Sequence, residues 1–393
     1  MARIRVKISK IIKGYMDKKI FMRNFLGFFI SFILASFILL KLFIKGEVMF
    51  YNHPHFPLPW DHHKYIFMAL TNPFDFHIAP YCWRVFVPFI ASFLPFTLSV
   101  NFLLISFISI VITGYFIYKI SLVYFDKIEY GISALFFYYS LNFAVNYLLY
   151  DFWLVDAFAI LLIVISLYAI LIKNDFIFGV TLILGALTKE SALFVIPLYY
   201  SLNSNKIWNI QLFFKTLILS LPALIVFVII RILILQMNGN PEYLSNLNEI
   251  LTVVYNGKSN FNYLTAFYEI GIVRIKNFNI SLLEEITIMS FGILIFLPFL
   301  SLRENSKLFI KYAPFLCLTY LQIFFAVNTS RLIIIAFPFF VIASLKGIRK
   351  MIIKLKLGRF LLIILSFITF MFFFMGDFSL IHVHVQFGRF YFH

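Results

Sequence analysis

The side chain best suited to acid–base chemistry in this sequence is Asp61, in the segment Trp-Asp-His-His-Lys-Tyr. A carboxylate can accept a proton from an attacking hydroxyl when its position and its pKa are suitable. His62, His63 and Tyr65 follow closely and are the candidates to support it. Taken alone, Asp61 fits a solvated aspartate at the membrane interface at least as well as a catalytic base. The residues that surround it in space must decide between these two interpretations.

Three cations elsewhere in the chain could bind an anion such as phosphate. Arg84 lies between aromatic residues in Pro-Tyr-Cys-Trp-Arg-Val-Phe-Val-Pro, and a guanidinium matches phosphate in a bidentate manner. Lys189 and the adjacent Glu190 interrupt an apolar run, and Arg331 follows Asn-Thr-Ser. Ionisable residues at membrane depth are costly and are by default functional candidates. Each cation has a competing interpretation. Arg84 could extend its charged end to the lipid headgroups, Lys189 and Glu190 could neutralise each other at a helix break, and the segment that ends at Arg331 could be a tight turn.

The composition indicates what must position these residues. The chain has 393 residues, of which 62% are hydrophobic and 13% charged, whereas a soluble domain has about a quarter charged residues. Its apolar residues fall in blocks long enough to cross a hydrocarbon core of about 30 Å as helices. The net charge of +16 is explained by basic loops that fix membrane topology. We therefore expect membrane lipids, and no nucleic acid, as partners.

The sequence predicts an all-α, polytopic transmembrane helical bundle with about eleven spans. The chain begins with a basic segment, 1–23. A transmembrane domain, 24–376, follows, and a short tail, 377–393, comes after it. The predicted spans are roughly 24–44, 99–121, 130–149, 152–172, 176–188, 191–203, 212–235, 286–302, 312–327, 332–345 and 360–376. The pair 176–188 and 191–203 is short for two full spans, so it could form tilted helices or a re-entrant hairpin around Lys189.

Lys and Arg concentrate on one side of this topology. The segments predicted to be cytoplasmic are 1–23, 122–129, 173–175, 204–211, 303–311 and 346–359. The opposite side has fewer cations despite two long loops, about 45–98 and 238–285. The first of these loops is expected to contain short interfacial helices, above all in 79–95. The predicted site residues then share the extracytoplasmic side, and the tail is extracytoplasmic as well.

All eight histidines map to that same side, and imidazole is a common metal ligand. They are His53, His55, His62, His63, His77, His382, His384 and His393. The His-x-His spacings at 53–55 and 382–384 are weak signals, because neither is a recognised closed site. We therefore expect no cofactor, and a divalent metal remains the less favoured alternative.

In the order of these features the sequence resembles bacterial GT-C-fold membrane glycosyltransferases. A basic N-terminus and a first span precede the outer loop with Asp61, and an aromatic-Arg-Pro stretch follows at 80–88. The segment 184–198, LGALTKESALFVIPL, is similar to the family's small-residue, Lys-Glu and Pro segment. Ser330-Arg331 with the later Pro338 resembles its late Arg-Pro span. The resemblance covers roughly residues 20–350, and each motif is short and degenerate.

The resemblance implies a GT-C-like fold and transfer of a sugar from a polyprenyl-phosphate donor to a hydroxyl acceptor on a glycan, lipid or protein. Asp61 would be the general base of an inverting reaction. Arg84, Lys189 and Arg331 would contact the donor phosphate. The paired-acid motif that makes some relatives metal-dependent is replaced here by Asp-His-His. The expected location is the bacterial inner (plasma) membrane, with a cytoplasmic N-terminus and the site outside.

Two other classes of function remain open at this stage. A transporter or flippase for an anionic lipid or solute would use buried charges on broken helices, often related by repeats. The break at Lys189 fits, but no matching broken segment stands out elsewhere. A non-enzymatic metal-binding membrane protein would use the outer-face histidines.

Overall fold

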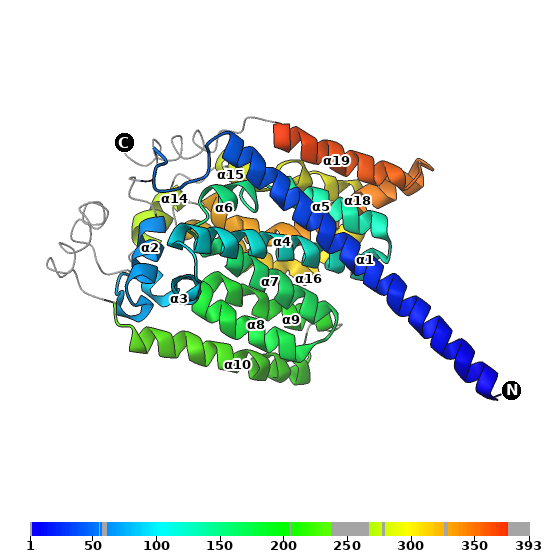
Figure 1. Cartoon of the computed structure of the whole chain (residues 1–393), viewed down its shortest axis with the longest axis horizontal. Helices are drawn as coiled ribbons and strands as arrows, with labels where there is room; N and C mark the ends of the chain where they lie inside the picture. The colour runs from blue at the N-terminus through cyan, green and yellow to red at the C-terminus, as the bar shows by residue number, and fades with distance from the viewer. Residues whose placement is uncertain are drawn as a thin grey trace.

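The computed structural model describes residues 2–54, 56, 61–204, 206, 208–236, 267–276, 280–325 and 329–375, and within these ranges every regular element is a helix. The longer helices are α1 (Ala2–Ile44), α4 (Leu98–Phe125), α5 (Ile128–Tyr139), α7 (Asp156–Leu171), α8 (Asp175–Thr188), α9 (Ile196–Asn203), α10 (Ile210–Leu233), α15 (Ile280–Phe291), α16 (Leu302–Leu321), α18 (Phe337–Lys354) and α19 (Phe360–Met375). Figure 1 shows them packed as one bundle in which most run along the longest axis.

Short helices connect the longer ones or extend them. They include α2 (His62–Leu70), α3 (Phe86–Phe93), α6 (Asn146–Tyr150), α14 (Ile272–Lys276) and α17 (Thr329–Ile333). Tighter 3₁₀ turns are η1 (Pro73–Asp75), η2 (Tyr81–Trp83), η3 (Glu190–Val195), η5 (Gly292–Ile295), η6 (Leu297–Ser301), η7 (Gln322–Phe324) and η8 (Ile334–Ala336), and η4 (Phe267–Gly271) is a wider π-helical turn. The first predicted outer loop thus contains short helices, α2 and α3 among them.

The chain is a membrane protein by the length and composition of its helices. Four helical stretches of the described residues can cross a bilayer: Ile20–Ile44, Leu98–Phe125, Ile210–Leu233 and Thr329–Lys354. The pair Ile286–Ile295 and Leu297–Phe324 is bent by 43° and adds a fifth if it is counted as one span. Each of the four has at least 18 residues, close to the length that a hydrocarbon core requires.

The predicted count of eleven spans is not confirmed. Asp156–Leu171, Asp175–Thr188 and Phe360–Met375 are apolar but shorter. The predicted span 130–149 is wrong as a single helix, because α5 ends at Tyr139 and the chain turns before α6. In that turn the backbone carbonyl of Asn142 accepts a hydrogen bond from the Tyr147 amide, 2.8 Å, which closes the chain on itself. A single span would need both groups inside its own helical ladder.

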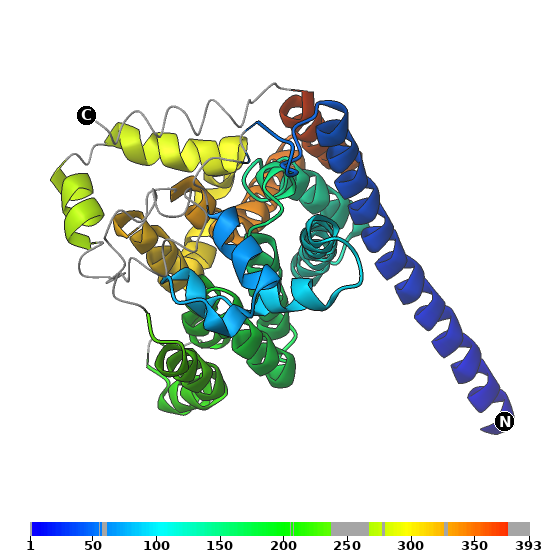
Figure 2. The same ribbon diagram turned by 60° about the vertical axis from the view of Figure 1, so that its left-hand side comes forward.

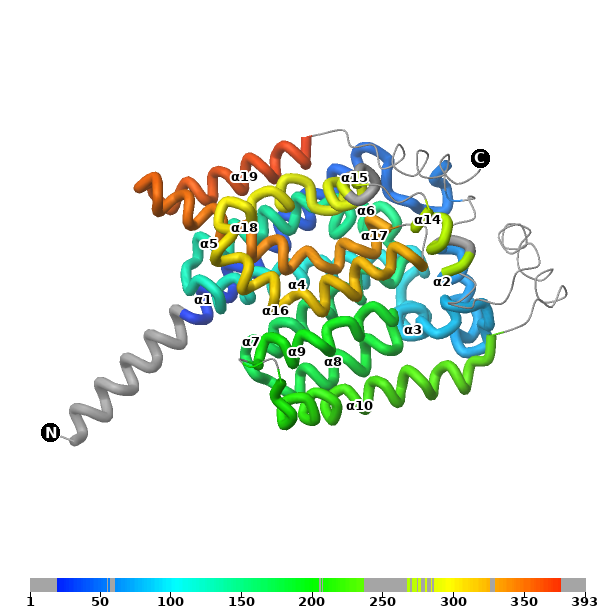
Figure 3. The backbone as a smooth tube through the Cα atoms, turned by 180° about the vertical axis from the view of Figure 1, so that it is seen from behind, coloured from blue at the N-terminus to red at the C-terminus, as the bar shows by residue number. Residues whose placement is uncertain are grey.

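The predicted cytoplasmic segment 303–311 is helical, since these residues form the first half of α16. Arg303, Glu304 and Lys307 in it are exposed, so the helix can begin in a polar environment and continue into an apolar one. The predicted span 312–327 begins within this same helix, which ends at Leu321 and is followed by η7. Figure 3 shows α16 beside α18, with which it packs.

The lipid-facing and core-facing helices differ strongly in burial. In the most apolar stretch of α10 only 22% of the residues are buried inside the protein, whereas in that of Thr329–Lys354 the share is 83%. Large apolar side chains such as Phe214, Ile218 and Leu221 cover the exposed face of α10. Figures 1 and 2 place α10 at the edge of the bundle. In a bilayer such a face needs no protein partner, because lipid chains are as apolar as the side chains.

The bundle has two chemically different ends. At one end, called the basic end here, Arg23 pairs with Asp126 at 3.2 Å, and Lys350 pairs with Glu304 at 3.9 Å. The turn after α4 lies there, with Asp126 in the left-handed region at φ 49°. The opposite end, called the site end, carries α2 and α3, at the left of Figure 1. Glu190, next to Lys189, belongs to this end because it pairs with Arg84 before α3.

The segment 175–203 forms a hairpin with Lys189 at its tip. α8 ends where Lys189 becomes extended, with φ −166° and ψ 133°, and the chain returns through η3 and α9. The two arms meet closely, because a Cβ added to Gly185 would lie 2.7 Å from the Cβ of Ala192. Further along, the Tyr199 hydroxyl donates to Asp175 Oδ1 at 2.6 Å. The sequence left open the path of this pair, and the structure makes it two antiparallel arms.

A small polar contact joins three helices within the apolar core. The Ser31 hydroxyl on α1 donates to the Val111 carbonyl on α4 at 2.7 Å and shares a 2.8 Å hydrogen bond with the Tyr139 hydroxyl on α5. Gly114 makes room for it, since a Cβ there would lie 2.4 Å from Ser31 Oγ. Buried hydroxyls in membrane helices act in this way as links between helices.

Replacing Gly114 by alanine is therefore expected to destabilise the bundle by about 1–3 kcal/mol, the usual cost of overpacking a dense core. The Ser31 hydroxyl must move, and its two hydrogen bonds are strained or lost. Thermal unfolding in detergent measures the effect. Gly179→Ala on α8 is the matched control, because its nearest neighbour would be the Leu219 carbonyl at 3.9 Å. Equal midpoints for the two variants would contradict the proposed packing.

Candidate functional site

Asp61 stands at the N-terminus of α2 and accepts hydrogen bonds on both carboxylate oxygens. Oδ1 accepts from the Tyr81 hydroxyl at 2.5 Å and from Lys64 Nζ at 3.3 Å. Oδ2 accepts from Arg331 Nη2 at 2.7 Å. Lys64 follows Asp61 by one helical turn, so α2 itself sets this pair. Arg331 comes from α17, 270 residues further along the chain.

Arg331 links Asp61 to a second ion pair. Its Nε lies 3.6 Å from Asp156 Oδ1, and that same oxygen accepts from Lys189 Nζ at 2.6 Å. Asp156 is the first residue of α7, and Lys189 is the tip of the α8–η3 hairpin. Their side chains are 4% and 5% exposed, so water contributes little to balancing either charge. Their mutual pairing, with Arg331, therefore carries most of the compensation.

Arg84 and Glu190 form the third ion pair of the site. Arg84 Nη2 donates to Glu190 Oε1 at 2.6 Å, and Nε donates to Oε2 at 3.2 Å, which is a bidentate arrangement. Arg84 Nη1 donates to the Tyr65 hydroxyl at 3.1 Å. Each nitrogen of the Arg84 guanidinium thus has a protein partner. This geometry holds the loop before α3 against the hairpin tip.

The predicted base, the three predicted phosphate-binding cations, Glu190 and Tyr65 therefore lie in one cluster at the site end, whereas His62 and His63 contact Phe56 instead. The cluster comprises Asp61, Lys64, Tyr65, Tyr81, Arg84, Asp156, Lys189, Glu190 and Arg331. The segments that supply them are separate in sequence, and helix packing alone brings them together. A network of this kind, held in a protein interior, binds anions only where a cation retains an unused donor. Arg331 Nε is such a donor, since it makes no hydrogen bond with the described residues.

The electrostatics of the cluster keep Asp61 ionised. Burial by itself raises the pKa of a carboxyl group, but Lys64 and Arg331 together with the Tyr81 hydroxyl hold the pKa of Asp61 well below its ordinary value. At neutral pH Asp61 is therefore a carboxylate. It is a weaker base than a free aspartate at equilibrium, and its lone pairs are oriented by the surrounding donors.

The two histidines after Asp61 face away from the ion pairs. Nε2 of His62 and Nε2 of His63 both lie near the Phe56 carbonyl, at 3.0 and 2.8 Å. Burial, with the neighbouring His63, lowers the pKa of His62 to about 3, so His62 is neutral at physiological pH. Among the described residues, no three His, Cys, Asp or Glu side chains are placed to hold a metal ion. His55, His382, His384 and His393 lie outside the described residues.

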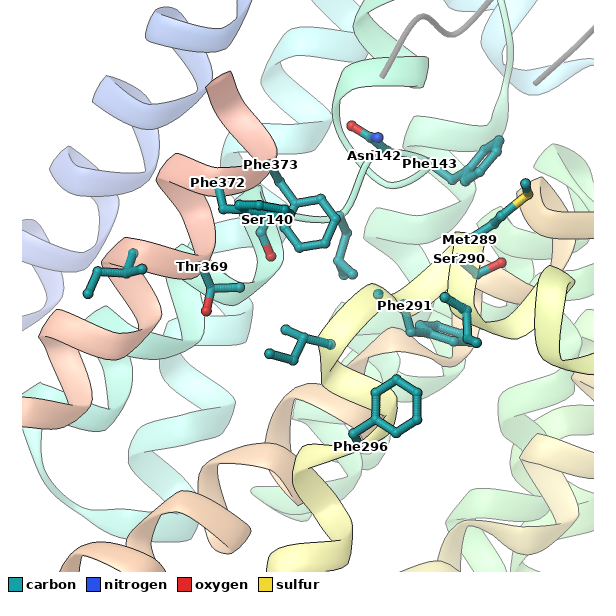
Figure 4. A pocket seen from close by; sticks show the side chains of 15 residues that line it. Ser140, Asn142, Phe143, Met289, Ser290, Phe291, Phe296, Thr369, Phe372 and Phe373 are labelled. Atoms are coloured by element: carbon teal, nitrogen blue, oxygen red, sulfur yellow. The ribbon is translucent and has the colours of Figure 1, made fainter. Parts of the chain in front are cut away.

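The structure also contains an apolar cavity of ≈ 560 Å³. It is lined by the turn after α5, by α15 and η5, and by α19, as Figure 4 shows. Phe291, Phe296, Phe372 and Phe373 supply most of the aromatic wall. A cavity of this size and character accommodates a hydrocarbon chain better than a polar ligand.

One hydrogen bond links the cavity wall to the segment that carries Arg331. Ser290 in the wall donates to the Ser330 carbonyl at 3.3 Å, one residue before Arg331. The backbone of Asn142, also in the wall, holds the Tyr147 amide, and Tyr147 interacts electrostatically with Arg331. The cavity wall and the segment of Arg331 are therefore linked through the same framework.

The sequence analysis missed several members of the cluster. Asp156 and Asp151 both lie at or near predicted spans, so the rule that singled out Lys189 applies equally to them. Lys64 was part of the Asp61 segment but was not assigned a role, and Tyr81 was read only as an aromatic flank. Tyr147 carried no signal, because tyrosine is common throughout this chain.

Comparison with known protein families, with curated proteins and with solved structures found no match for this chain. An assignment of function therefore depends on two grounds, the chemistry of the cluster and the order of motifs in the sequence. The chemistry favours an anionic ligand with an apolar chain. The motif order favours a transferase over a carrier.

Proposed function

We propose that this protein is an integral-membrane glycosyltransferase of GT-C type. It transfers a sugar from a polyprenyl-phosphate donor to a hydroxyl acceptor with inversion at the anomeric carbon. The reaction takes place at the site end of the bundle, which faces the extracytoplasmic side of a bacterial plasma membrane. No cofactor is required in this proposal.

The observation that supports the proposal is the link between the wall of the apolar cavity and the segment that carries Arg331. A polyprenyl phosphate has one anionic group joined to a long hydrocarbon chain. Ser290 and Ser330 join the cavity wall to the residue next to Arg331. A lipid chain in the cavity would therefore present its phosphate to the cluster. A soluble anion would gain nothing from the cavity, so the arrangement favours an amphipathic donor.

The cations differ in how readily they could bind the phosphate. Arg331 Nε makes no hydrogen bond with the described residues and lies 3.6 Å from Asp156 Oδ1, which makes Arg331 the strongest candidate. Among the described residues Lys189 has one ion-pair partner, Asp156, so its ammonium keeps donors for a ligand. Arg84 is fully occupied by Glu190 and Tyr65, so its contribution is to position the hairpin tip.

Asp61 is the proposed general base. It is ionised, and it lies 2.7 Å from the guanidinium that would hold the phosphate. As the acceptor hydroxyl attacks the anomeric carbon, its proton passes to Asp61 while the C–O bond to the phosphate breaks. The electron pair of that bond leaves with the phosphate, where the cations stabilise it. A base on the face opposite the leaving group gives inversion.

Transport of an anionic lipid is the second candidate, and one observation favours it. The helices from Ile286 to Phe324 are bent by 43° at a short break, and the hairpin tip at Lys189 is a second break. Broken helices beside buried charges are typical of transporters. The charges here lie at one end of the bundle rather than at its centre, which favours the transferase.

Reconstitution into liposomes separates the two candidates. The probe is a pool of polyprenyl-phosphate sugars, radiolabelled in the sugar and extracted from bacterial membranes. We expect label to pass from the prenyl-phosphate fraction to an acceptor fraction only when both donor and acceptor membranes are supplied. Protein-free liposomes and heat-denatured protein are the controls.

The opposite result has a clear form. Movement of the labelled lipid between leaflets in the absence of any acceptor, without formation of a new glycoside, would overturn the transferase and support the carrier. Absence of both transfer and movement, with binding of the probe also absent, would remove the anionic-lipid site itself.

A further inference from the structure

Asp151 is a buried carboxyl group at the edge of the cluster that has no assigned role. It lies in the linker between α6 and α7, outside the candidate membrane spans, and is 2% exposed. Its amide donates to the Tyr147 carbonyl at 2.8 Å, which fixes its backbone. Its Oδ1 has no hydrogen-bond partner among the described residues. A buried, unpartnered carboxylate oxygen is costly, so its protonation state needs an explanation.

Titratable groups on α17, α7, α6 and at the start of α2 act on Asp151. Arg331 on α17 is the cation, and it stabilises the ionised form. Asp61 before α2 and Asp156 on α7 are carboxylates, and both oppose ionisation. Tyr147 and Tyr150 on α6 interact with Asp151 electrostatically as neutral phenols at physiological pH. One shared guanidinium therefore faces three carboxyl groups.

The charge balance of the cluster depends on this one residue. Its cations are Lys64, Arg84, Lys189 and Arg331, and its paired carboxylates are Asp61, Asp156 and Glu190. With Asp151 neutral, the cations exceed the carboxylates by one charge. With Asp151 ionised, the cluster has no excess charge, and Arg331 must balance the charge of Asp151 as well as those of Asp61 and Asp156. A bound phosphate diester carries the single negative charge that the first state can accept.

We propose that Asp151 is the proton-carrying residue of this site, neutral when an anionic headgroup is bound, so that wherever Asp151 is ionised in the free protein, binding of the anion is accompanied by uptake of a proton. This inference rests on the proposed function, in that it takes the ligand to be a lipid phosphate. It assigns Asp151 a positioning role through Arg331, because ionised Asp151 competes with the ligand for that guanidinium.

The acid–base properties of Asp151 are consistent with this role. Burial raises the pKa of Asp151 to about 8, and the nearby carboxylates add to the effect of burial against the opposing effect of Arg331. Because this folded-state value lies above that of a free aspartic acid, the folded protein holds a proton on Asp151 that the unfolded chain releases. Above the folded value Asp151 becomes charged, and an anion is then bound less tightly.

The test measures binding of a prenyl methyl phosphodiester to the purified full-length protein in nanodiscs. This probe keeps one negative charge across the range, unlike a phosphate monoester. For the wild type we expect affinity to fall by about tenfold between about pH 6 and pH 9.5, since a pKa difference of one unit between bound and free protein corresponds to that factor. In Asp151→Asn the affinity should be independent of pH. Calorimetry in buffers of different ionisation enthalpy should show proton uptake near pH 8 for the wild type alone.

Asp126→Asn, at the exposed turn on the basic end, is the matched control and should keep the wild-type pH profile. An Asp151→Asn profile with the wild-type slope would overturn the proposal while leaving the proposed function intact, because the probe would still bind. Failure of the wild type to bind the probe at any pH would overturn the proposed function and the role of Asp151 with it.

A second measurement does not depend on any ligand. The infrared carbonyl band of a protonated carboxylic acid should be present in the wild type near pH 6, disappear toward pH 10 and be missing from Asp151→Asn. If the wild-type spectrum contains no carbonyl band that disappears in Asp151→Asn, Asp151 is ionised throughout the pH range. That result would overturn the proposal even if Asp151→Asn folds poorly.

Discussion

Replacing Asp61 by asparagine is expected to reduce sugar transfer by about 10²–10⁴-fold, the usual contribution of a general base. Asparagine keeps the size and can still accept a hydrogen bond from Tyr81, but it cannot take the acceptor's proton. It also leaves Arg331 and Lys64 with one fewer carboxylate. The measurement is the initial rate of transfer from labelled donor at saturating acceptor.

Binding of the donor distinguishes a chemical role of Asp61 from a structural one. Because the site gains one net positive charge in Asp61→Asn, we expect the donor to bind at least as tightly as in the wild type while the rate falls. Tyr81→Phe removes one donor to Asp61 without changing charge and should reduce the rate far less. Full transfer activity in Asp61→Asn would exclude it as the base.

Replacing Arg331 by glutamine is expected to destabilise the folded protein by about 3–5 kcal/mol, the usual effect of removing one partner of a buried ion pair. Arg331 neutralises Asp61 directly and lies within ion-pair distance of Asp156. Its side chain is only 11% exposed, so water cannot replace it. The loss should be visible in thermal unfolding in detergent or nanodiscs, together with loss of donor binding.

Two further variants separate the loss of a pair from a general effect of substitution. Arg303→Gln changes an exposed arginine on α16 and should alter stability by less than about 0.5 kcal/mol. Combining Arg331→Gln with Asp61→Asn should recover part of the lost stability, because an unpaired carboxylate is removed as well. Strict additivity of the two changes would contradict a direct interaction between these residues.

The functional proposals differ in which results would remove them. Loss of transfer in Asp61→Asn with retained donor binding supports the base and the donor site together. Retained lipid movement in that same variant would favour a carrier, for which the chemistry of Asp61 is unimportant. The pH profile of Asp151→Asn tests only how the site manages charge, so it is independent of whether transfer follows binding.

The sequence alone was sufficient for the class of structure. Apolar blocks of spanning length leave a helix as the simplest structure that satisfies every backbone group, and long helices at 2–44, 98–125 and 210–233 follow from it. The same physical rule, that charge within apolar sequence is costly, picked out Asp61, Arg84, Lys189 and Arg331. It could not rank them, because the cost of a buried charge depends on its partner.

The partners were decided by tertiary structure. Asp61 and Arg331 are 270 positions apart, and only the tertiary structure brings the start of α2 and α17 close enough for their ion pair. Likewise, Lys189 and Glu190 looked like a local pair in sequence, yet they bind Asp156 and Arg84 instead. Neighbouring residues on an extended backbone point in different directions, so each side chain finds its counter-ion on another element.

The number of spans was also beyond the sequence. Hydropathy detects that 130–149 and 303–327 are apolar or mixed, but it does not report where a helix breaks. The turn after Tyr139 contains a hydrogen bond from the Tyr147 amide to the Asn142 carbonyl, and α16 runs on as one helix that packs against α18. The sequence by itself therefore determined a helical membrane protein with costly charges to compensate. Only the tertiary structure decided which charges compensate which, because that depends on distances between helices that no local pattern encodes.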